Sequence, residues 1–270
     1  MDSRPIGVFD SGLGGLTTVK KLAEYLPCED IIYLGDTGRV PYGSRSEETI
    51  IKYAKQDAAF LAMHDIKAMI IACNTVSSTA YHVLESIYDE MPIFEVITAP
   101  VAQAVSSTKN NKIGIIGTSA TIRSGAYEKK LKEISPKLNV LTKACPLFVP
   151  MVEYGRTDEN DIAALTITED YLASLREFEV DTLILGCTHY PLLHRVISKV
   201  MGSNVTLIDS GAQTAKRAAE VLLAKDMLSS AKARGNIKYF ITDSVSDFSE
   251  LASHFLGSPV DGLVEQISLD

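Results

Sequence analysis

Short apolar segments of four to six residues alternate along the chain with longer segments in which apolar residues recur every three or four positions. The short segments predict β-strands and the longer ones predict amphipathic helices. Strands are expected at residues 5–9, 30–34, 68–72, 92–97, 112–117, 138–142, 181–186, 204–209 and 237–242. Helices are expected at residues 15–25, 47–64, 77–89, 122–134, 161–178, 190–200 and 212–224.

This alternation of strands and helices predicts an α/β fold built from βαβ units with mainly parallel sheets flanked by helices. The segment AMIIA at residues 68–72 is apolar throughout, as expected for a strand in a sheet that is covered on both faces. Ligands of such folds bind beyond the carboxyl ends of the strands. Polar residues that directly follow a predicted strand are therefore the candidates for a functional site.

The 270 residues are comfortably divided into two domains, and the later part of the chain loosely repeats the earlier part. IGVFDSG (6–12) resembles IGIIGTS (113–119), AMIIACNT (68–75) resembles TLILGCTH (182–189), and LIDSGAQT (207–214) echoes VFDSGLGG (8–15). The stretch SSTKNN (106–111) is the most linker-like, and a boundary is expected near residue 98. We expect residues 1–97 and 211–270 to form a first α/β domain and residues 98–210 to form a second.

The composition and charge narrow the classes of function. Hydrophobic residues make up 46% of the chain and charged residues 22%, as in globular proteins in water, and the net charge is −8 with a pI near 5.2. An acidic chain of this kind argues against nucleic acid as the primary ligand. The N-terminus resembles neither a signal peptide nor a transit peptide, and no apolar run approaches the ~18 residues of a membrane span. We expect a cytoplasmic protein with no membrane contact.

The four cysteines include no CxxC pair, which makes a zinc ribbon or a thioredoxin-type motif an unlikely pattern here. In a cytoplasmic chain they are expected to be free thiols, and each could simply be a small buried apolar residue. Cys73, Cys187, His189 and His194 are possible zinc ligands by type, but their spacing matches no zinc motif. No metal is therefore expected.

The segment VFDSGLGG (8–15) places an acid, a hydroxyl and three glycines at the end of a predicted strand. Glycines allow backbone N–H groups to approach a ligand, but the spacing matches neither common phosphate-binding loop. Asp10 could be the nucleophile of a haloacid-dehalogenase-like phosphatase, except that Gly12 stands where a second acid is required. Alternatively, Asp10 is only a helix cap. The later segment DTGRVPYGSRS (36–46) is a polar loop whose Pro-Tyr-Gly could form an ordinary turn.

Cys73 and Cys187 each stand where an apolar strand ends and polar residues begin. Each is followed by hydrogen-bonding residues, which are Asn74 and Thr75 in the first case and Thr188 and His189 in the second. One such cysteine would suggest the nucleophile of a thiol hydrolase. Two equivalent ones suggest proton transfer at opposite faces of one carbon, in which one thiolate removes a proton and the other group, as a thiol, supplies one.

The motifs VFDSGLGGL, PYG, ACNT and GCTH, in this order, resemble those of the bacterial glutamate racemases, which belong to the cofactor-independent Asp/Glu racemase superfamily. The segments 113–127, 145–153 and 208–211 match as well, so the resemblance covers essentially the whole chain. The differences, at Gly38, Val40 and Tyr154, touch no expected catalytic residue.

This resemblance implies a pair of pseudo-symmetric α/β domains with the site between them. It further implies interconversion of L- and D-glutamate for peptidoglycan synthesis without pyridoxal phosphate or metal, and no lysine lies in a cofactor-anchoring motif. By the family pattern Cys73 deprotonates D-glutamate and Cys187 deprotonates L-glutamate, with Asp10 near Cys73, and with Glu153 and His189 near Cys187. The substrate-binding residues would be Asp10, Ser11, Pro41, Tyr42, Gly43, Cys73, Asn74, Thr75, Thr118, Thr121, Cys187, Thr188 and His189.

In this scheme, backbone and hydroxyl donors stabilise the substrate carboxylates and the developing carbanion without a cationic side chain. The family includes homodimers of differing arrangement as well as monomers that depend on an activator, and we expect a homodimer here. The alternatives that stay open are an aspartate racemase of the same superfamily, a hydrolase or lyase that uses one cysteine, and a non-catalytic binding protein, since some family members interact with DNA gyrase. The presence of both cysteines argues against an inactive protein.

Overall fold

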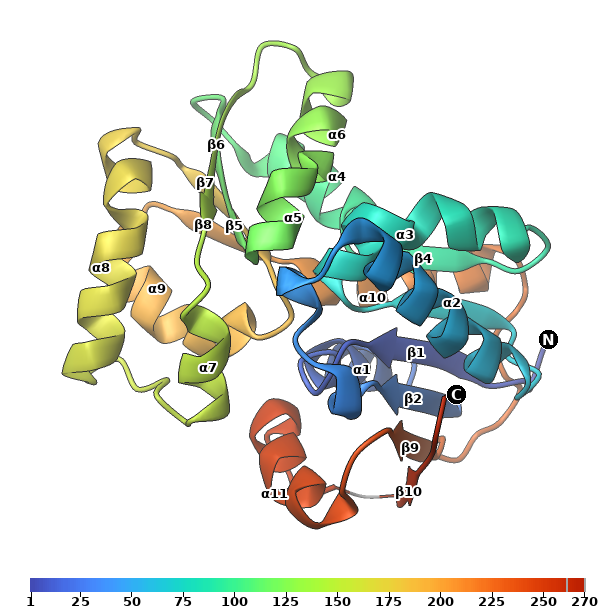
Figure 1. Cartoon of the computed structure of the whole chain (residues 1–270). Helices are drawn as coiled ribbons and strands as arrows, with labels where there is room; N and C mark the ends of the chain where they lie inside the picture. Colours follow the sequence, from blue (N-terminus) through green and yellow to red (C-terminus); the bar gives the residue numbers. More distant parts are fainter. Residues whose placement is uncertain (261, 270) are drawn as a thin grey trace.

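The computed structural model describes residues 1–260 and 262–269 and contains two parallel β-sheets, each flanked by helices (Figure 1). The first sheet has the order β10-β9-β2-β1-β3-β4 and the second has the order β6-β5-β7-β8. The strands of the first sheet are β1 (Ile6–Asp10), β2 (Ile31–Gly35), β3 (Ala68–Ile71), β4 (Ile93–Glu95), β9 (Ile237–Ile241) and β10 (Leu263–Gln266). Those of the second are β5 (Lys112–Gly117), β6 (Asn139–Ala144), β7 (Thr182–Gly186) and β8 (Thr206–Asp209). The predicted α/β fold is confirmed.

Four strands of the first sheet, in the order β2-β1-β3-β4, are arranged like the four strands of the second sheet. In the first, β1 lies between β2 and β3 and β4 follows β3; in the second, β5 lies between β6 and β7 and β8 follows β7. The chain therefore changes direction along the sheet at β1/β3 and again at β5/β7. Such switch points are where open α/β sheets bind ligands. Cys73 follows β3 and Cys187 follows β7, so the repeated motif stands at the same place in both halves.

The helices cover the faces of both sheets (Figure 1). They are α1 (Leu16–Tyr25), α2 (Glu47–Ala62), α3 (Asn74–Ile87), α4 (Thr98–Ser107), α5 (Ser119–Ser124), α6 (Ala126–Ile134), α7 (Phe148–Glu153), α8 (Ile162–Glu177), α9 (His194–Met201), α10 (Ser210–Ala224) and α11 (Val245–Leu256). Single 3-10 turns are formed by η1 (Thr37–Arg39), η2 (Tyr42–Ser44) and η3 (Tyr190–Leu193).

All nine predicted strands are found, but sequence reasoning missed β10, α4, α7 and α11. The helix α7 has six residues and contains Pro150, so it is too short for a helical period to be visible. The helix α4 carries Pro100 in its first turn and occupies part of the segment expected to be a linker. The helix expected at residues 122–134 is two helices, because Gly125 adopts a φ of 64° between α5 and α6.

The first sheet takes strands from both ends of the chain, because β9 pairs with β2 after the chain has left the second sheet. The helix α10 begins directly after β8 but packs against α1, and Asp209 caps its N-terminus by accepting a hydrogen bond from Ala212 N at 3.0 Å. No observation fixes residues 97/98 and 210/211 as boundaries, and that division stays a prediction.

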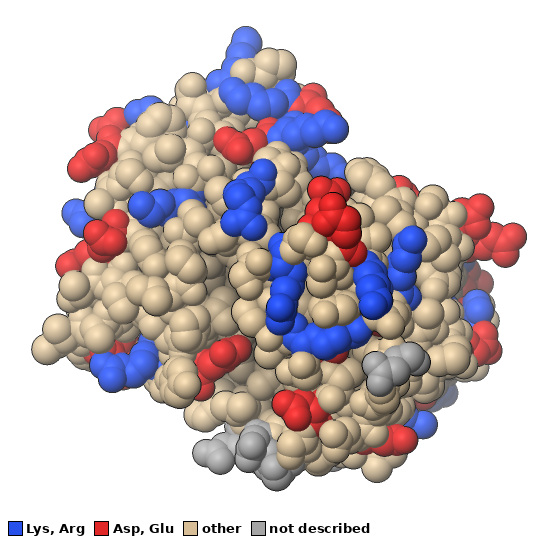
Figure 2. All heavy atoms as spheres, viewed as in Figure 1, with Lys and Arg blue, Asp and Glu red and all other residues tan. Residues whose placement is uncertain are grey.

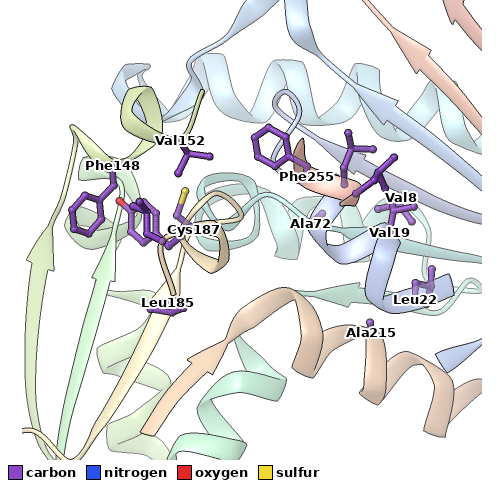
Figure 3. Close-up of a cluster of buried hydrophobic side chains, with 14 of the residues drawn as sticks. Val8, Val19, Leu22, Ala72, Phe148, Val152, Leu185, Cys187, Ala215 and Phe255 are labelled. Atoms are coloured by element: carbon purple, nitrogen blue, oxygen red, sulfur yellow. The ribbon is translucent and has the colours of Figure 1, made fainter. Parts of the chain in front are cut away.

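One apolar cluster continues across the junction between the two halves (Figure 3). Val8, Val19 and Ala72 come from the first half, and Leu185 and Cys187 come from the second. Because protein interiors are close-packed, a shared cluster of this kind limits how freely the halves can shift. The geometry at the junction is therefore set by the core itself.

On the face shown in Figure 2, basic and acidic side chains are intermingled over much of the surface, and a small group of basic residues on the lower right lobe is bordered by acidic ones. Within residues 1–260 and 262–269, no helix combines the length and the apolar character that crossing a membrane requires.

Candidate active site

A cavity of about 610 Å³ lies between the two halves, beyond the carboxyl ends of the central strands. Most of the residues expected from the sequence line it, and these are Ser11, Pro41, Tyr42, Gly43, Cys73, Asn74, Thr75, Thr118, Glu153, Cys187, Thr188 and His189. Its volume suits a small molecule. Segments as far apart as Ser11 and His189 are brought together because both switch points face this cavity.

Cys73 occupies the N-cap position of α3, directly after β3. Its side chain is buried, and Sγ donates a hydrogen bond to Ser11 Oγ at 3.3 Å. Burial is the main cause that raises the pKa of the Cys73 thiol to about 12, and the nearby Asp10 carboxyl acts in the same direction. At neutral pH Cys73 is therefore a thiol and can act as a proton donor.

Asp10 ends β1 and is almost completely buried. Its Oδ2 accepts hydrogen bonds from Gly12 N at 3.2 Å and Gly15 N at 3.0 Å, and the latter group stands at the start of α1. Oδ1 has no partner among the described residues. Burial raises the pKa of Asp10. The residue thus partly caps α1, as the simpler reading of the sequence proposed, and it also retains one free carboxyl oxygen beside Cys73.

Cys187, His189 and Glu153 form a chain of contacts on the other side of the cavity. Cys187 Sγ lies 4.0 Å from His189 Nδ1, and His189 Nε2 lies 3.1 Å from Glu153 Oε1. Burial alone would lower the pKa of His189, but its contacts with Cys187 and Glu153 raise it to about 10. At neutral pH His189 therefore carries a proton, and its positive charge stabilises a thiolate on Cys187.

The first half of the chain touches this second catalytic group directly. Thr17 Oγ1 donates a hydrogen bond to the carbonyl oxygen of Thr188 at 3.1 Å. A Cβ atom at Gly14 would lie 2.1 Å from Thr188 Oγ1 and 2.6 Å from His189 Nδ1, so only glycine fits this position. Gly14 of VFDSGLGG thus allows the two halves to come together around His189.

The polar residues expected to bind substrate are already partly engaged with one another. Asn74 donates to Ser210 Oγ at 3.2 Å and accepts from the Tyr127 hydroxyl at 2.5 Å. Thr75 Oγ1 and Thr118 Oγ1 are 3.1 Å apart and join the two halves. Asn74 is therefore held rigidly, whereas the threonine hydroxyls can reorient toward a ligand.

Two expected contact residues do not line the cavity. Asp10 lies behind Ser11 and Cys73, and Thr121 lies within α5, where its hydroxyl is 3.0 Å from Thr118 Oγ1. Tyr42 lines the cavity, but its hydroxyl is bonded to buried carboxyl groups. These positions support an indirect role for Asp10 and Thr121, and for Tyr42 a contact through its backbone or ring.

Sequence reasoning missed several residues that line the cavity, namely Gly12, Val40, Ser44, Ser119, Arg123, Pro146, Val149 and Pro150. All of them neighbour a motif that was recognised, so the flanks of each motif were the available signal. Arg123 is the one Lys or Arg in the described lining, and it is exposed. From the sequence, only backbone and hydroxyl donors were considered, and Arg123 adds a cationic side chain to the lining of the cavity.

Within residues 1–260 and 262–269, no group of three or more His, Cys, Asp or Glu side chains has an arrangement suited to a metal ion. The zinc alternative would need Cys73, Cys187 and His189 to converge with a fourth ligand. In place of such a convergence, Cys73 contacts Ser11 while Cys187 contacts His189. The two thiols therefore have separate partners on separate sides of the cavity.

Comparison with known proteins places this geometry in context. A family model described as Asp/Glu/Hydantoin racemase matches residues 6–218. A glutamate racemase of Geobacter metallireducens is 46% identical over 270 residues, which cover 100% of this chain and 98% of that protein. The crystal structure of the glutamate racemase isoform RacE1 from Bacillus anthracis has a TM-score of 0.94 at 37% identity, covering 100% of this chain and 99% of the other. That of a Francisella tularensis glutamate racemase in complex with D-glutamate has a TM-score of 0.92 at 40% identity, with the same coverage.

Proposed function

The chain belongs to the Asp/Glu/hydantoin racemase family, and from this premise we propose that it is a glutamate racemase that interconverts L- and D-glutamate by proton transfer between two thiols. The observation that carries the proposal is one cavity with a buried cysteine at the equivalent strand end of each half. The reaction inverts one carbon, and two bases on opposite sides match that requirement.

In the direction from L- to D-glutamate, the Cys187 thiolate removes the α-proton and the Cys73 thiol protonates the opposite face of the carbanion. The bond from the α-carbon to hydrogen breaks on one side and re-forms on the other, and no electrons are gained or lost. The resting charges agree with this assignment, because His189 is protonated beside Cys187 and burial keeps Cys73 a thiol. In the reverse direction, Cys73 begins as the thiolate and Cys187 as the thiol.

The carbanion is the difficult intermediate, since the α-proton of an amino-acid carboxylate is very weakly acidic. Fixed donors in a water-poor cavity stabilise developing negative charge without reorganising during the reaction. Asn74 and Thr188 are buried and line the cavity, and Arg123 stands at its exposed edge. These residues are our proposal for binding the two carboxylates and stabilising the carbanion.

The proposed function is tested by incubating the purified protein with L-glutamate in D₂O, with no cofactor added and with L-aspartate in parallel. Proton NMR follows loss of the α-hydrogen and circular dichroism follows loss of optical activity. Deuterium entry with decay of the optical signal for glutamate alone is the expected result. Exchange on aspartate alone would keep the mechanism and replace the substrate. Absence of exchange on both would reject the racemase and favour a one-cysteine hydrolase.

The Asp10→Asn variant is expected to lower kcat by about tenfold in the direction that needs a Cys73 thiolate, which is D- to L-glutamate. The amide keeps the size of the side chain but cannot take up a proton. Because the two enantiomers have equal free energies, kcat/KM is identical in both directions for every variant, and the asymmetry must be sought in kcat and in isotope effects. Primary deuterium isotope effects that change equally for both enantiomers would remove Asp10 from this role.

We further propose a cytoplasmic homodimer that supplies D-glutamate for peptidoglycan. Large apolar side chains that are exposed in the single chain, such as Met63, Tyr154 and Ile162, are available for a contact between subunits. Light scattering on the full-length protein would detect a dimer as twice the chain mass of 29.3 kDa. A mass of one chain at enzyme concentrations that are active would reject the dimer.

A further inference from the structure

The loop that joins β2 to α2 supplies one wall of the cavity through Tyr42 and Gly43. The tyrosine side chain is directed into the first half, where it is 1% exposed and packs against the ring of Tyr53 with centroids 5.4 Å apart. Its hydroxyl donates to Asp36 and lies 3.0 Å from Asp57 Oδ2. The part of this loop that lines the cavity is therefore anchored through the Tyr42 hydroxyl to Asp36 and Asp57, which do not line the cavity themselves.

Arg39 contacts both carboxyl groups, and the four side chains of Asp36, Arg39, Tyr42 and Asp57 form one cluster. Arg39 Nε donates to Asp36 Oδ2 at 2.5 Å, and its Nη2 donates to Asp57 Oδ1 at 3.0 Å. Its guanidinium also lies 4.1 Å from the centre of the Tyr53 ring, and Nη1 donates to Gln56 Oε1 at 2.6 Å. Both carboxyl groups are fully buried, with 0% of either side chain exposed. Buried groups of this kind hold their positions firmly only when all of them are paired.

Counting protons fixes the charge of the cluster. The Tyr42 hydroxyl has one proton and touches two carboxyl groups, so it donates to one of them and accepts from the other. Asp36 receives the proton of Tyr42, together with hydrogen bonds from Arg39 and, at 2.8 Å, from Thr242 Oγ1. Asp57 must then donate to the tyrosine oxygen, which requires a neutral carboxylic acid.

The surroundings agree with this count. Burial, followed by the charge of Asp36, raises the pKa of Asp57 well above its usual range. One Arg39 cation is then balanced by one Asp36 anion, and no uncompensated charge remains in the cluster.

We propose that Asp36, Arg39 and Asp57 are positioning residues that fix the Tyr42–Gly43 segment at the substrate cavity. The inference rests on the proposed racemase function for its catalytic meaning, although the geometry of the loop can be tested without any substrate. The segment needs such support because η2 is a single turn that no side chain caps. A Cβ atom at Gly43 would come within 3.1 Å of Thr118 Cβ, so small shifts of this loop change how it meets the other half.

The two aspartates allow a matched test, because the same substitution should have opposite outcomes. In Asp57→Asn, the amide nitrogen donates to the Tyr42 oxygen and the amide oxygen accepts from Arg39, as the neutral acid does. In Asp36→Asn, the amide places a donor against the donors of Tyr42, Arg39 or Thr242. Asp57→Leu removes both polar contacts at similar volume and should behave like Asp36→Asn.

We expect KM for L-glutamate to rise about tenfold in Asp36→Asn and in Asp57→Leu, with kcat changed by less than about threefold, because the binding wall is loosened while the thiols remain in place. Backbone amides of residues 37–45 should exchange with deuterium about tenfold faster in these two variants. Asp57→Asn should stay within about twofold of the wild-type protein in both measurements. If Asp36→Asn does not fold, Thr242→Val is used in its place, and a smaller increase in exchange of the same residues is expected.

The proposal would be overturned if the backbone amides of residues 37–45 exchanged with deuterium at the wild-type rate in a folded Asp36→Asn or Thr242→Val protein. Faster exchange with an unaltered KM would overturn its catalytic part, and an Asp57→Asn variant as impaired as Asp57→Leu would overturn the proton count. Failure of the wild-type protein to racemise glutamate rejects the proposed function alone, since the exchange measurement still reports on the loop.

Discussion

Replacing either Cys73 or Cys187 with alanine is expected to abolish racemisation in both directions, with a loss of at least ~10³-fold in kcat/KM. Each turnover needs one thiol as base and the other as acid, so the loss of either one stops both directions. Alanine is smaller than cysteine, so neither substitution should create a steric clash at these two buried positions. The two variants should therefore be folded and inactive.

The measurement is α-hydrogen exchange in D₂O together with optical rotation, starting from each enantiomer separately. Any residual exchange should be confined to L-glutamate in Cys73→Ala and to D-glutamate in Cys187→Ala, since each variant retains one base on one face. Cys28→Ala is the control, because Cys28 is a free thiol that does not line the cavity, and its activity should be unchanged. Racemisation above a trace in either Cys73→Ala or Cys187→Ala would contradict the two-base mechanism. Full activity in one of them would favour a single-cysteine enzyme.

The equivalence of the two thiols was visible in the sequence because it depends on local pattern. A strand that ends in a cysteine followed by polar residues can be recognised twice, and parallel strands bring such ends to one edge of a sheet. The structure adds that β1/β3 and β5/β7 are equivalent switch points in two sheets that share this arrangement of four strands. Local pattern was therefore sufficient for every described strand except β10 and for placing Cys73 and Cys187 at strand ends, whereas a shared site between the two halves was implied only by the family resemblance.

The remainder depends on contacts between distant residues, which one sequence does not reveal. Asp36 meets Thr242, which is 206 positions away, and the aspartate in the loop reads as an ordinary turn residue. The ring of Phe255 in α11 packs edge-on against His189, with centroids 5.2 Å apart. This contact of Phe255 with His189 was missed because the helix that carries Phe255 was not predicted.

His189→Asn is expected to reduce kcat for L-glutamate by about a hundredfold near pH 7, the second largest effect after the loss of a thiol. Asparagine can still donate a hydrogen bond to Cys187 but carries no positive charge. The thiolate that removes the proton of L-glutamate then lacks the positive charge of His189, whose Nδ1 lies 4.0 Å from Cys187 Sγ. For D-glutamate Cys187 acts as a thiol, so kcat should fall less, with KM adjusting to keep kcat/KM equal for the two enantiomers.

The dependence on pH distinguishes a charge effect from a loss of packing. The pKa of His189 is raised to about 10, so its proton favours the folded protein. That stabilisation is complete below the ordinary histidine value near ~6.5 and is lost as the pH rises through about 10. Wild-type kcat for L-glutamate should be maintained up to that region, and the deficit of His189→Asn should narrow as the pH rises through about 10, because the wild-type protein then loses the charge of His189 as well.

Glu153→Gln is the companion variant, because the amide oxygen can still accept from His189 Nε2 but the negative charge is lost. Glu153 has 43% of its side chain exposed, so solvent weakens its effect and the expected loss in kcat is only a few-fold. If the imidazolium acts directly on Cys187, kcat for L-glutamate should be much lower in His189→Asn than in Glu153→Gln. A deficit in His189→Asn that stays constant as the pH rises through about 10 would instead assign His189 a packing role against Phe255, and the thiolate of Cys187 would then require another source of stabilisation.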